Sequence, residues 1–98
     1  MQFLVIAYDG TDDSAMERRM AAREAHLAGI VKMKEEGKAI YGVAILNERG
    51  QMIGSVLVVD YPTRADVDAW LRTEAYVVGD VWRKIEVLPA KVPPMFVK

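Results

Sequence analysis

The chain consists of short apolar runs separated by two stretches in which apolar residues recur at helical spacing. Each apolar run has the length and residue types of a β-strand. The four runs are residues 2–8, 38–46, 51–61 and 81–88. A long helix is expected from about Asp13 to Glu36, ending at Gly37, a residue type suited to the position just after a helix. A shorter helix is expected to open at Thr63 and Asp66, so the predicted order is β-α-β-β-α-β.

Polar segments between these runs provide the predicted caps and turns. Ser14 and Glu17 have the spacing of a capping box, and residues 47–50 have the composition of a hairpin turn. Residues 74–79 are expected to form a turn or a short helical piece. The tail, residues 89–98, holds three of the four prolines and is expected to be extended. Its apolar residues are expected to pack on a partner subunit or over a pocket mouth, unless the tail is disordered: Val92, Met95 and Phe96.

This order of elements predicts one α+β domain over residues 1–98. With right-handed crossovers it gives a ferredoxin-like fold, a four-stranded antiparallel sheet with both helices on one face. The first and third strands are apolar at nearly every position, whereas a sheet with one wet face should alternate. Two helices cover only one face. We therefore expect a homodimer in which two sheets pack against each other as a dimeric α+β barrel.

Composition and charge exclude several classes of function. With 13 basic and 14 acidic residues the chain offers no broad basic field, so we expect no nucleic-acid partner. The absence of cysteine removes disulfide and thiolate chemistry and fits a cytoplasmic protein. No apolar run reaches membrane-spanning length, and the N-terminus does not read as a signal peptide, so no membrane association is expected.

No cofactor and no metal ion are expected either. The chain has one histidine and no cysteine, which leaves only carboxylates as metal ligands. Asp9, Asp12 and Asp13 in the first turn are interpreted as acids at the start of a helix. Trp70 and Trp82 are interpreted as core or dimer-interface residues.

The first helix carries the most informative chemistry. At about 100° per residue, one apolar stripe runs along it and is expected to face the core. The stripe consists of Met16, Met20, Leu27 and Val31, with Ile30 at its edge. Arg23 falls inside this stripe, and Arg19 and His26 lie along its flank. Imidazole is the side chain best suited to acid/base work near neutral pH.

Two interpretations of this corner remain open. In one, Arg19, Arg23 and His26 form a partly buried polar corner that receives an anionic or enol-forming small molecule. In the other, Arg23 pairs with an internal carboxylate and His26 only closes the edge of the core. The spacing of the residues does not decide between them.

The ordered set of segments resembles the YciI-like (YCII-related) family of small dimeric α+β barrel proteins. The resemblance covers nearly the whole chain. It rests on 23–27 and 35–37 around the first helix, on Gly42, on 54–60 in the third strand, on 65–70 in the second helix, and on 74–82.

The resemblance implies an enzyme with a histidine–aspartate pair in a pocket. The family histidine corresponds to His26, and the family Asp-Pro-Tyr segment to Glu74-Ala75-Tyr76. Glutamate keeps the carboxylate but lengthens its arm, and alanine replaces the proline that fixes the backbone. A second family acid corresponds to Glu35, also with a longer arm.

Two further residues complete the predicted site. Tyr76 is expected either to donate a hydrogen bond to substrate or to pack with its hydroxyl satisfied. Ser55 lies on a strand and is expected to face the pocket, but the chain has no nucleophile elbow, which disfavours a serine hydrolase.

Two functions follow as hypotheses. The first is a cofactor-independent enzyme of lyase, isomerase or dehalogenase-like type, as the resemblance implies, acting on a small and often cyclic or aromatic-derived compound. In it His26 moves a proton, Glu74 orients the imidazole, and Arg19 or Arg23 holds an anionic group. The alternative is a binding or sensor module without catalysis, which the altered Glu74-Ala75 segment favours.

Overall fold

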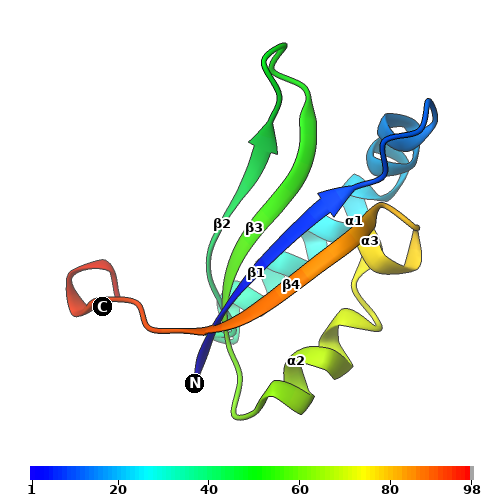
Figure 1. Cartoon of the computed structure of the whole chain (residues 1–98). Coiled ribbons are helices and arrows are strands. Elements are labelled where there is room, and N and C mark those ends of the chain that lie inside the picture. The colour runs from blue at the N-terminus through cyan, green and yellow to red at the C-terminus, as the bar shows by residue number, and fades with distance from the viewer. Residues whose placement is uncertain (98) are drawn as a thin grey trace.

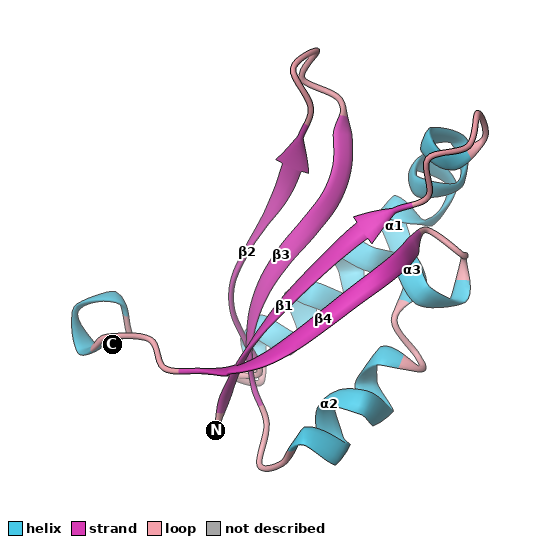
Figure 2. Ribbon diagram, viewed as in Figure 1, coloured by secondary structure: helices cyan, strands magenta, loops and turns pink. Residues whose placement is uncertain are grey.

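The computed structural model describes residues 1–97 and confirms the predicted α+β architecture (Figures 1 and 2). Its elements are β1 (Gln2–Asp9), α1 (Ala15–Glu35), β2 (Ala39–Leu46), β3 (Met52–Asp60), α2 (Arg64–Leu71), α3 (Ala75–Val78), β4 (Trp82–Ala90) and a 3₁₀ helix, η1 (Pro94–Phe96). The strands form one antiparallel sheet in the order β2-β3-β1-β4. This is the order of a ferredoxin-like fold.

Alternation along the central strands places the core between the sheet and the helices. Phe3, Val5 and Ala7 of β1 are buried, as are Leu57 and Val59 of β3. The core is closed by residues from the second half of the chain: Val67, Tyr76, Val81 and Trp82. Figure 1 shows the long helix α1 lying across the sheet, with α2 and α3 beyond β4 in that view.

The prediction for the buried face of α1 was wrong. Met20, Leu27 and Val31 of the predicted stripe are 43–57% exposed, and the buried residues of α1 are instead Arg19, His26 and Met33. These three are spaced by seven residues and therefore also share one helix face. The helix thus buries two polar side chains, and each has a buried partner: Arg19 contacts Asp9 and Ser55, and His26 contacts Glu74.

The predicted helix ends are mostly confirmed. Thr63 and Asp66 form the capping box at the start of α2, with both reciprocal hydrogen bonds present. Helix α1 ends at Glu35, one residue early, and Gly37 adopts φ +76°, the left-handed conformation that favours glycine. Ser14 is the N-cap residue of α1 but makes no side-chain capping bond, so the predicted capping box there is wrong.

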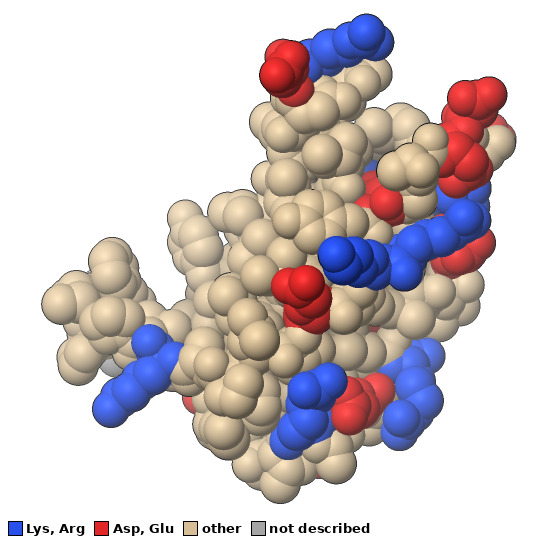
Figure 3. Space-filling view, in the orientation of Figure 1, with Lys and Arg blue, Asp and Glu red and all other residues tan. Residues whose placement is uncertain are grey.

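The sheet face away from α1 is apolar over its centre. Register places Leu4 beside Val58 and Ile6 beside Val56, and β2 adds Tyr41 and Val43 to the same face. Tyr41 is 71% and Val43 is 50% exposed. Figure 3 views this side of the molecule and shows it nearly free of charged groups over β2 and β3. Both faces of β1 and β3 therefore carry apolar side chains, as their uninterrupted apolar sequences predicted. No element within residues 1–97 covers this face.

The tail departs from the predicted extended form. Strand β4 continues to Ala90, and a 3₁₀ turn forms at Pro94–Phe96. Met95 and Phe96 are 77% and 75% exposed, and Figure 1 shows this segment projecting away from the sheet. Val92 lines a small hollow together with Met1, Gln2 and Asp60. The prediction that the tail packs on a partner subunit stays a prediction. Lys98 lies outside the described residues.

Candidate active site

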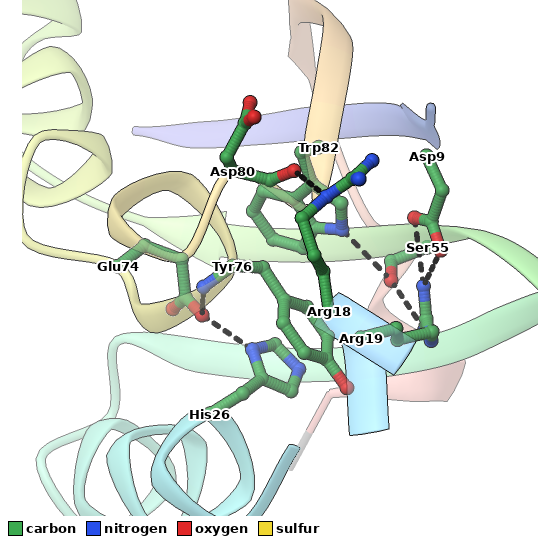
Figure 4. Close-up of polar contacts among 9 residues, drawn as sticks. All are labelled: Asp9, Arg18, Arg19, His26, Ser55, Glu74, Tyr76, Asp80 and Trp82. Atoms are coloured by element: carbon green, nitrogen blue, oxygen red, sulfur yellow. Dashed lines mark hydrogen bonds and ion pairs between the residues drawn. The ribbon is translucent and has the colours of Figure 1, made fainter. Parts of the chain in front are cut away.

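Four polar or charged residues are buried in the described chain, and all four belong to the predicted site: Arg19, His26, Ser55 and Glu74. They come from α1, β3 and the start of α3, so they meet only after folding. At the centre, the His26 Nδ1 atom is hydrogen-bonded to Glu74 Oε1 (Figure 4). The two residues are 48 positions apart in sequence.

Local structure holds the Glu74 carboxylate in place. Glu74 is the N-cap residue of α3, and its Oε1 atom also accepts a hydrogen bond from the Tyr76 backbone N–H at 3.3 Å. An oxygen that accepts from an amide is acting as an acceptor, so we assign the shared proton to His26 Nδ1. In the neutral imidazole the Nε2 atom then carries a free lone pair, which is what a general base requires.

Two aromatic rings fix the plane of the imidazole. Tyr76 stacks on His26 with ring centroids 3.9 Å apart and an interplanar angle of 13°. Trp82 packs edge-on against the imidazole, with the two ring centroids 5.7 Å apart. The imidazole can therefore neither rotate nor tilt without displacing a packed ring. In Figure 4 the Tyr76 hydroxyl and the second imidazole nitrogen project to the same side, away from Glu74.

The Tyr76 hydroxyl is poised to act as a hydrogen-bond donor. Burial raises the pKa of Tyr76 above its usual value, and this outweighs the opposing effect of the Arg19 and Arg23 charges. The hydroxyl therefore keeps its proton at neutral pH. It makes no hydrogen bond within residues 1–97.

Arg19 is held by a buried network. Its Nη1 atom lies 2.9 Å from both carboxylate oxygens of Asp9, and its Nη2 atom donates to Ser55 Oγ at 3.0 Å. Trp82 Nε1 donates to the same Ser55 Oγ at 3.2 Å, and the guanidinium lies 4.7 Å above the Tyr76 ring. Ser55 is thus a buried acceptor that ties two side chains together. The Nε atom of Arg19 is buried without a partner in the described chain.

Arg23 differs from Arg19 because its charge is not neutralised. It forms no ion pair or hydrogen bond within residues 1–97, and its charge acts on the Tyr76 hydroxyl. The interpretation in which Arg23 pairs with an internal carboxylate is wrong, since Arg19 takes that carboxylate. Arg23 is the free cation of this corner.

These side chains line one cleft of about 210 Å³ between α1 and the strands β2 and β3. Its polar lining consists of Arg19, Arg23, His26, Ser55 and Tyr76, and its apolar lining includes Leu27, Ile30, Gly42, Ala44, Met52 and Leu57. Glu74 does not line this cleft. Glu74 instead lines a wider groove between α1 and α2, and neither His26 nor Arg23 is among the residues that line that groove. The His26–Glu74 pair therefore forms part of the wall between the two spaces.

The remaining predicted residues fall outside the cleft. Glu35 is exposed at the last residue of α1. The interpretation of Asp9 as a helix-start acid is wrong, because its side chain is only 5% exposed and pairs with Arg19. Asp9 follows Phe3, Val5 and Ala7 at every second position, so strand alternation carried a signal for its burial.

Asp12 belongs to a separate surface network beyond the end of β1. Asp12 accepts two hydrogen bonds from Arg18, and Asp80 accepts two from Arg83. The arginine contacts hold the pKa of each carboxyl below its usual range. This network fixes the loop before α1 against the loop before β4.

Within residues 1–97 no group of three or more histidine or acidic side chains is placed to hold a metal ion. Among the helices of the same residues, none combines the length and apolar character needed to cross a bilayer.

Together the fold and the buried pair define a ferredoxin-like α+β protein with a histidine–carboxylate cleft. The YCII-related domain family matches residues 1–91, and the chain belongs to that family. It is 26% identical over 97 residues to Protein YciI of Escherichia coli O6:H1, covering 93% of this chain and 97% of that protein, and equally similar to Protein YciI of Shigella flexneri.

Solved structures share the fold. 5-Chloro-2-hydroxyhydroquinone dehydrochlorinase (TftG) of Burkholderia phenoliruptrix, in complex with 2,5-dihydroxybenzoquinone, superposes with a TM-score of 0.81 at 20% identity, over 97% of this chain and 98% of that one. A dimeric ferredoxin-like protein of unknown function from Jannaschia sp. CCS1 has a TM-score of 0.52 at 19% identity, over 93% and 98%.

Proposed function

We propose that this protein is a cofactor-independent enzyme that performs acid/base chemistry on a small molecule. The observation that carries the proposal is a buried histidine whose Nδ1 atom is held by a buried carboxylate while the rest of its ring lines a cleft. Structural histidines also make such bonds. This one in addition lies beside Arg23 and the Tyr76 hydroxyl, neither of which has a partner within residues 1–97, and together they suit an ionisable substrate.

Each side chain has a distinct role in the proposed mechanism. His26 Nε2 takes a proton from the substrate, and Glu74 stabilises the imidazolium that forms and keeps the ring oriented. The Tyr76 hydroxyl donates to the oxygen on which negative charge develops. Arg23 holds an anionic group, whereas Arg19 is a positioning residue whose charge is already balanced by Asp9. The proton returns from His26 to the product or to the leaving group.

The likeness to TftG supports the reaction class. That protein is a dehydrochlorinase seen with a quinone, and elimination from a ring begins with removal of a proton by a base. The proposed roles of His26 and Tyr76 fit such a step. They fit an isomerase equally well, because proton transfer next to a carbonyl uses the same base and the same oxyanion donor.

The alternative is a small-molecule binding module of the same fold. The Glu74-Ala75 departure from the family segment was its support. In the structure Glu74 still reaches His26, and Ala75 is accommodated in α3, so the longer arm does not separate the pair. This geometry favours the enzyme.

A ligand screen with a product readout separates the two functions. We expect small carboxylates, phenols and hydroxyquinones to raise the melting temperature, and at least one stabilising compound to be converted on incubation, as seen by mass spectrometry. Stabilisation without any converted compound across the panel would favour the binding module. Boiled protein serves as the control for spontaneous decay of the quinones.

We further propose that two copies of the chain pair through the apolar sheet face. The mass measured by light scattering at micromolar concentration is then expected to be twice the 11.0 kDa of one chain. Val56→Lys places a charge at the centre of this face and is expected to give monomers. The matched control is Val31→Lys, on the exposed apolar stripe of α1. If only Val31→Lys gave monomers, the sheet face would not be the interface.

A further inference from the structure

We propose that Ser55 is a second hydroxyl donor to the substrate, and that Arg19 and Trp82 turn its proton toward the cleft. The inference rests on the proposed function and deepens it, because it assigns a further hydrogen bond to the reacting molecule in the same site. Ser55 keeps its proton throughout the reaction. It donates a hydrogen bond to a substrate oxygen and does not act as a nucleophile.

The hydrogen bonds at Ser55 leave only its proton unused. A serine hydroxyl can donate one proton and can accept through two lone pairs. Arg19 Nη2 donates to Ser55 Oγ at 3.0 Å and Trp82 Nε1 donates to it at 3.2 Å, so both lone pairs are occupied (Figure 4). Neither a guanidinium nor an indole N–H can accept a proton in return. Within residues 1–97 the Ser55 hydroxyl makes no further hydrogen bond.

The strand order determines which side of Ser55 is free. Strand β3, which carries Ser55, lies between β2 and β1, and Trp82 begins β4 on the far side of β1. The cleft lies on the other side, because all the strand residues that line it belong to β2 and β3. Ala44, the register partner of Ser55 on β2, is one of them. With Trp82 on the β1 side and Arg19 on α1, the remaining direction at Oγ is toward the cleft.

Burial gives this unused proton a chemical consequence. Ser55 is only 4% exposed, and buried polar groups of native proteins almost always have a hydrogen-bond partner. An oxygen atom of the bound substrate supplies the missing acceptor. The bonds that Oγ accepts from Arg19 and Trp82 polarise the hydroxyl and strengthen its own donation. Together with the Tyr76 hydroxyl, which lines the same cleft, Ser55 suits a carbonyl compound that gains negative charge on oxygen when His26 removes a proton.

The indole N–H of Trp82 reports on the Ser55 proton without any turnover. The test titrates wild-type protein with acetate, a small oxygen acceptor, and follows the two indole N–H signals and the His26 ring signals by NMR. Donation from Ser55 to acetate makes Oγ a better acceptor, so the Trp82 signal is expected to move downfield. Trp70 stacks on Tyr61 and does not line the cleft, so its signal is the internal control. If acetate shifts the His26 signals but leaves Trp82 unchanged, the proposal is wrong.

Variants of Ser55 provide the second measurement. Ser55→Ala is expected to bind acetate about tenfold more weakly or worse, and Ser55→Thr, which keeps the hydroxyl, to restore binding. The matched control is Ser14→Ala, because Ser14 is exposed and its side chain makes no capping bond.

Two outcomes would overturn the assignment: no acetate binding by wild-type protein, or wild-type affinity in a folded Ser55→Ala variant. If Ser55→Ala does not fold, the titration of wild-type protein still decides. The Trp82 response in a protein that converts no compound would uphold this inference while defeating the proposed enzyme. Turnover that Ser55→Ala leaves unchanged would uphold the enzyme and defeat the inference.

Discussion

Replacing His26 by asparagine is expected to lower kcat by about 10²- to 10⁴-fold on whichever compound the screen shows to be converted. The reason is that an amide cannot accept a proton at the position of Nε2. Asparagine can still donate to Glu74 from its side-chain nitrogen, so the buried carboxylate keeps a partner and the fold should persist. Circular dichroism and the melting temperature check the fold, and steady-state kinetics give kcat and KM separately.

The pattern of kinetic change distinguishes a base from a structural histidine. Loss of a group that acts in the transition state lowers kcat with little change in KM. Glu74→Gln is the companion variant, because its amide oxygen can still accept from Nδ1–H and from Tyr76 N–H but carries no charge. It is expected to cost less than His26→Asn, since it removes stabilisation of the imidazolium and leaves the base in place. Wild-type kcat in His26→Asn would end the catalytic assignment.

The strands, helices and strand order were predictable because each depends on local signals. Period-two and helical spacing, the Thr63–Asp66 box and Gly37 lie within a few residues of the features that they specify. Chain connectivity then limits the arrangement of four strands and two crossovers to few topologies. The open sheet face was predictable for the same reason, since it follows from uninterrupted apolar runs in β1 and β3.

The buried face of α1 was not predictable from its own sequence. Hydrophobicity alone predicts that Met20 and Leu27 are buried and that Arg19 and His26 are exposed. That prediction would be correct if the polar side chains had no partners in the core. Their partners are Asp9, Ser55 and Glu74, which lie 10, 36 and 48 residues away. These contacts decide which face turns inward, and no window along α1 contains them.

The likeness to the family pointed to the His26–Glu74 pair, whereas residue chemistry alone pointed only to His26. The sequence around Glu74 does not predict its burial. Glu74 lies between the end of one helix and the start of a four-residue helix, which is too short to show a helical pattern of apolar residues. Distinguishing Arg19 from Arg23 also required the fold. Both are basic and lie one turn apart on α1, yet only Arg19 meets a carboxylate.

The largest effect on stability is expected at Asp9. In Asp9→Asn the buried Arg19 guanidinium loses its counter-charge, and removing one member of a buried pair costs about 3–5 kcal/mol in the free energy of unfolding. For a domain of this size that lowers the melting temperature by roughly 12 °C or more. Urea unfolding at one fixed protein concentration measures it. Asp12→Asn, at an exposed ion pair with Arg18, is the control expected to change little.

The double variant Asp9→Asn, Arg19→Gln decides whether the unpaired charge is the cause. Removing the cation as well abolishes the cost of burying it alone, so the double variant is expected to be more stable than Asp9→Asn. It does not reach wild-type stability, because Arg19 also donates to Ser55 and stacks over Tyr76. If the destabilisations of the two single variants simply add, Asp9 acts through packing rather than charge. The buried network would then act as core packing, and the charge of Arg23 and the His26–Glu74 pair would be the electrostatic features that distinguish this cleft from an ordinary helix–sheet contact.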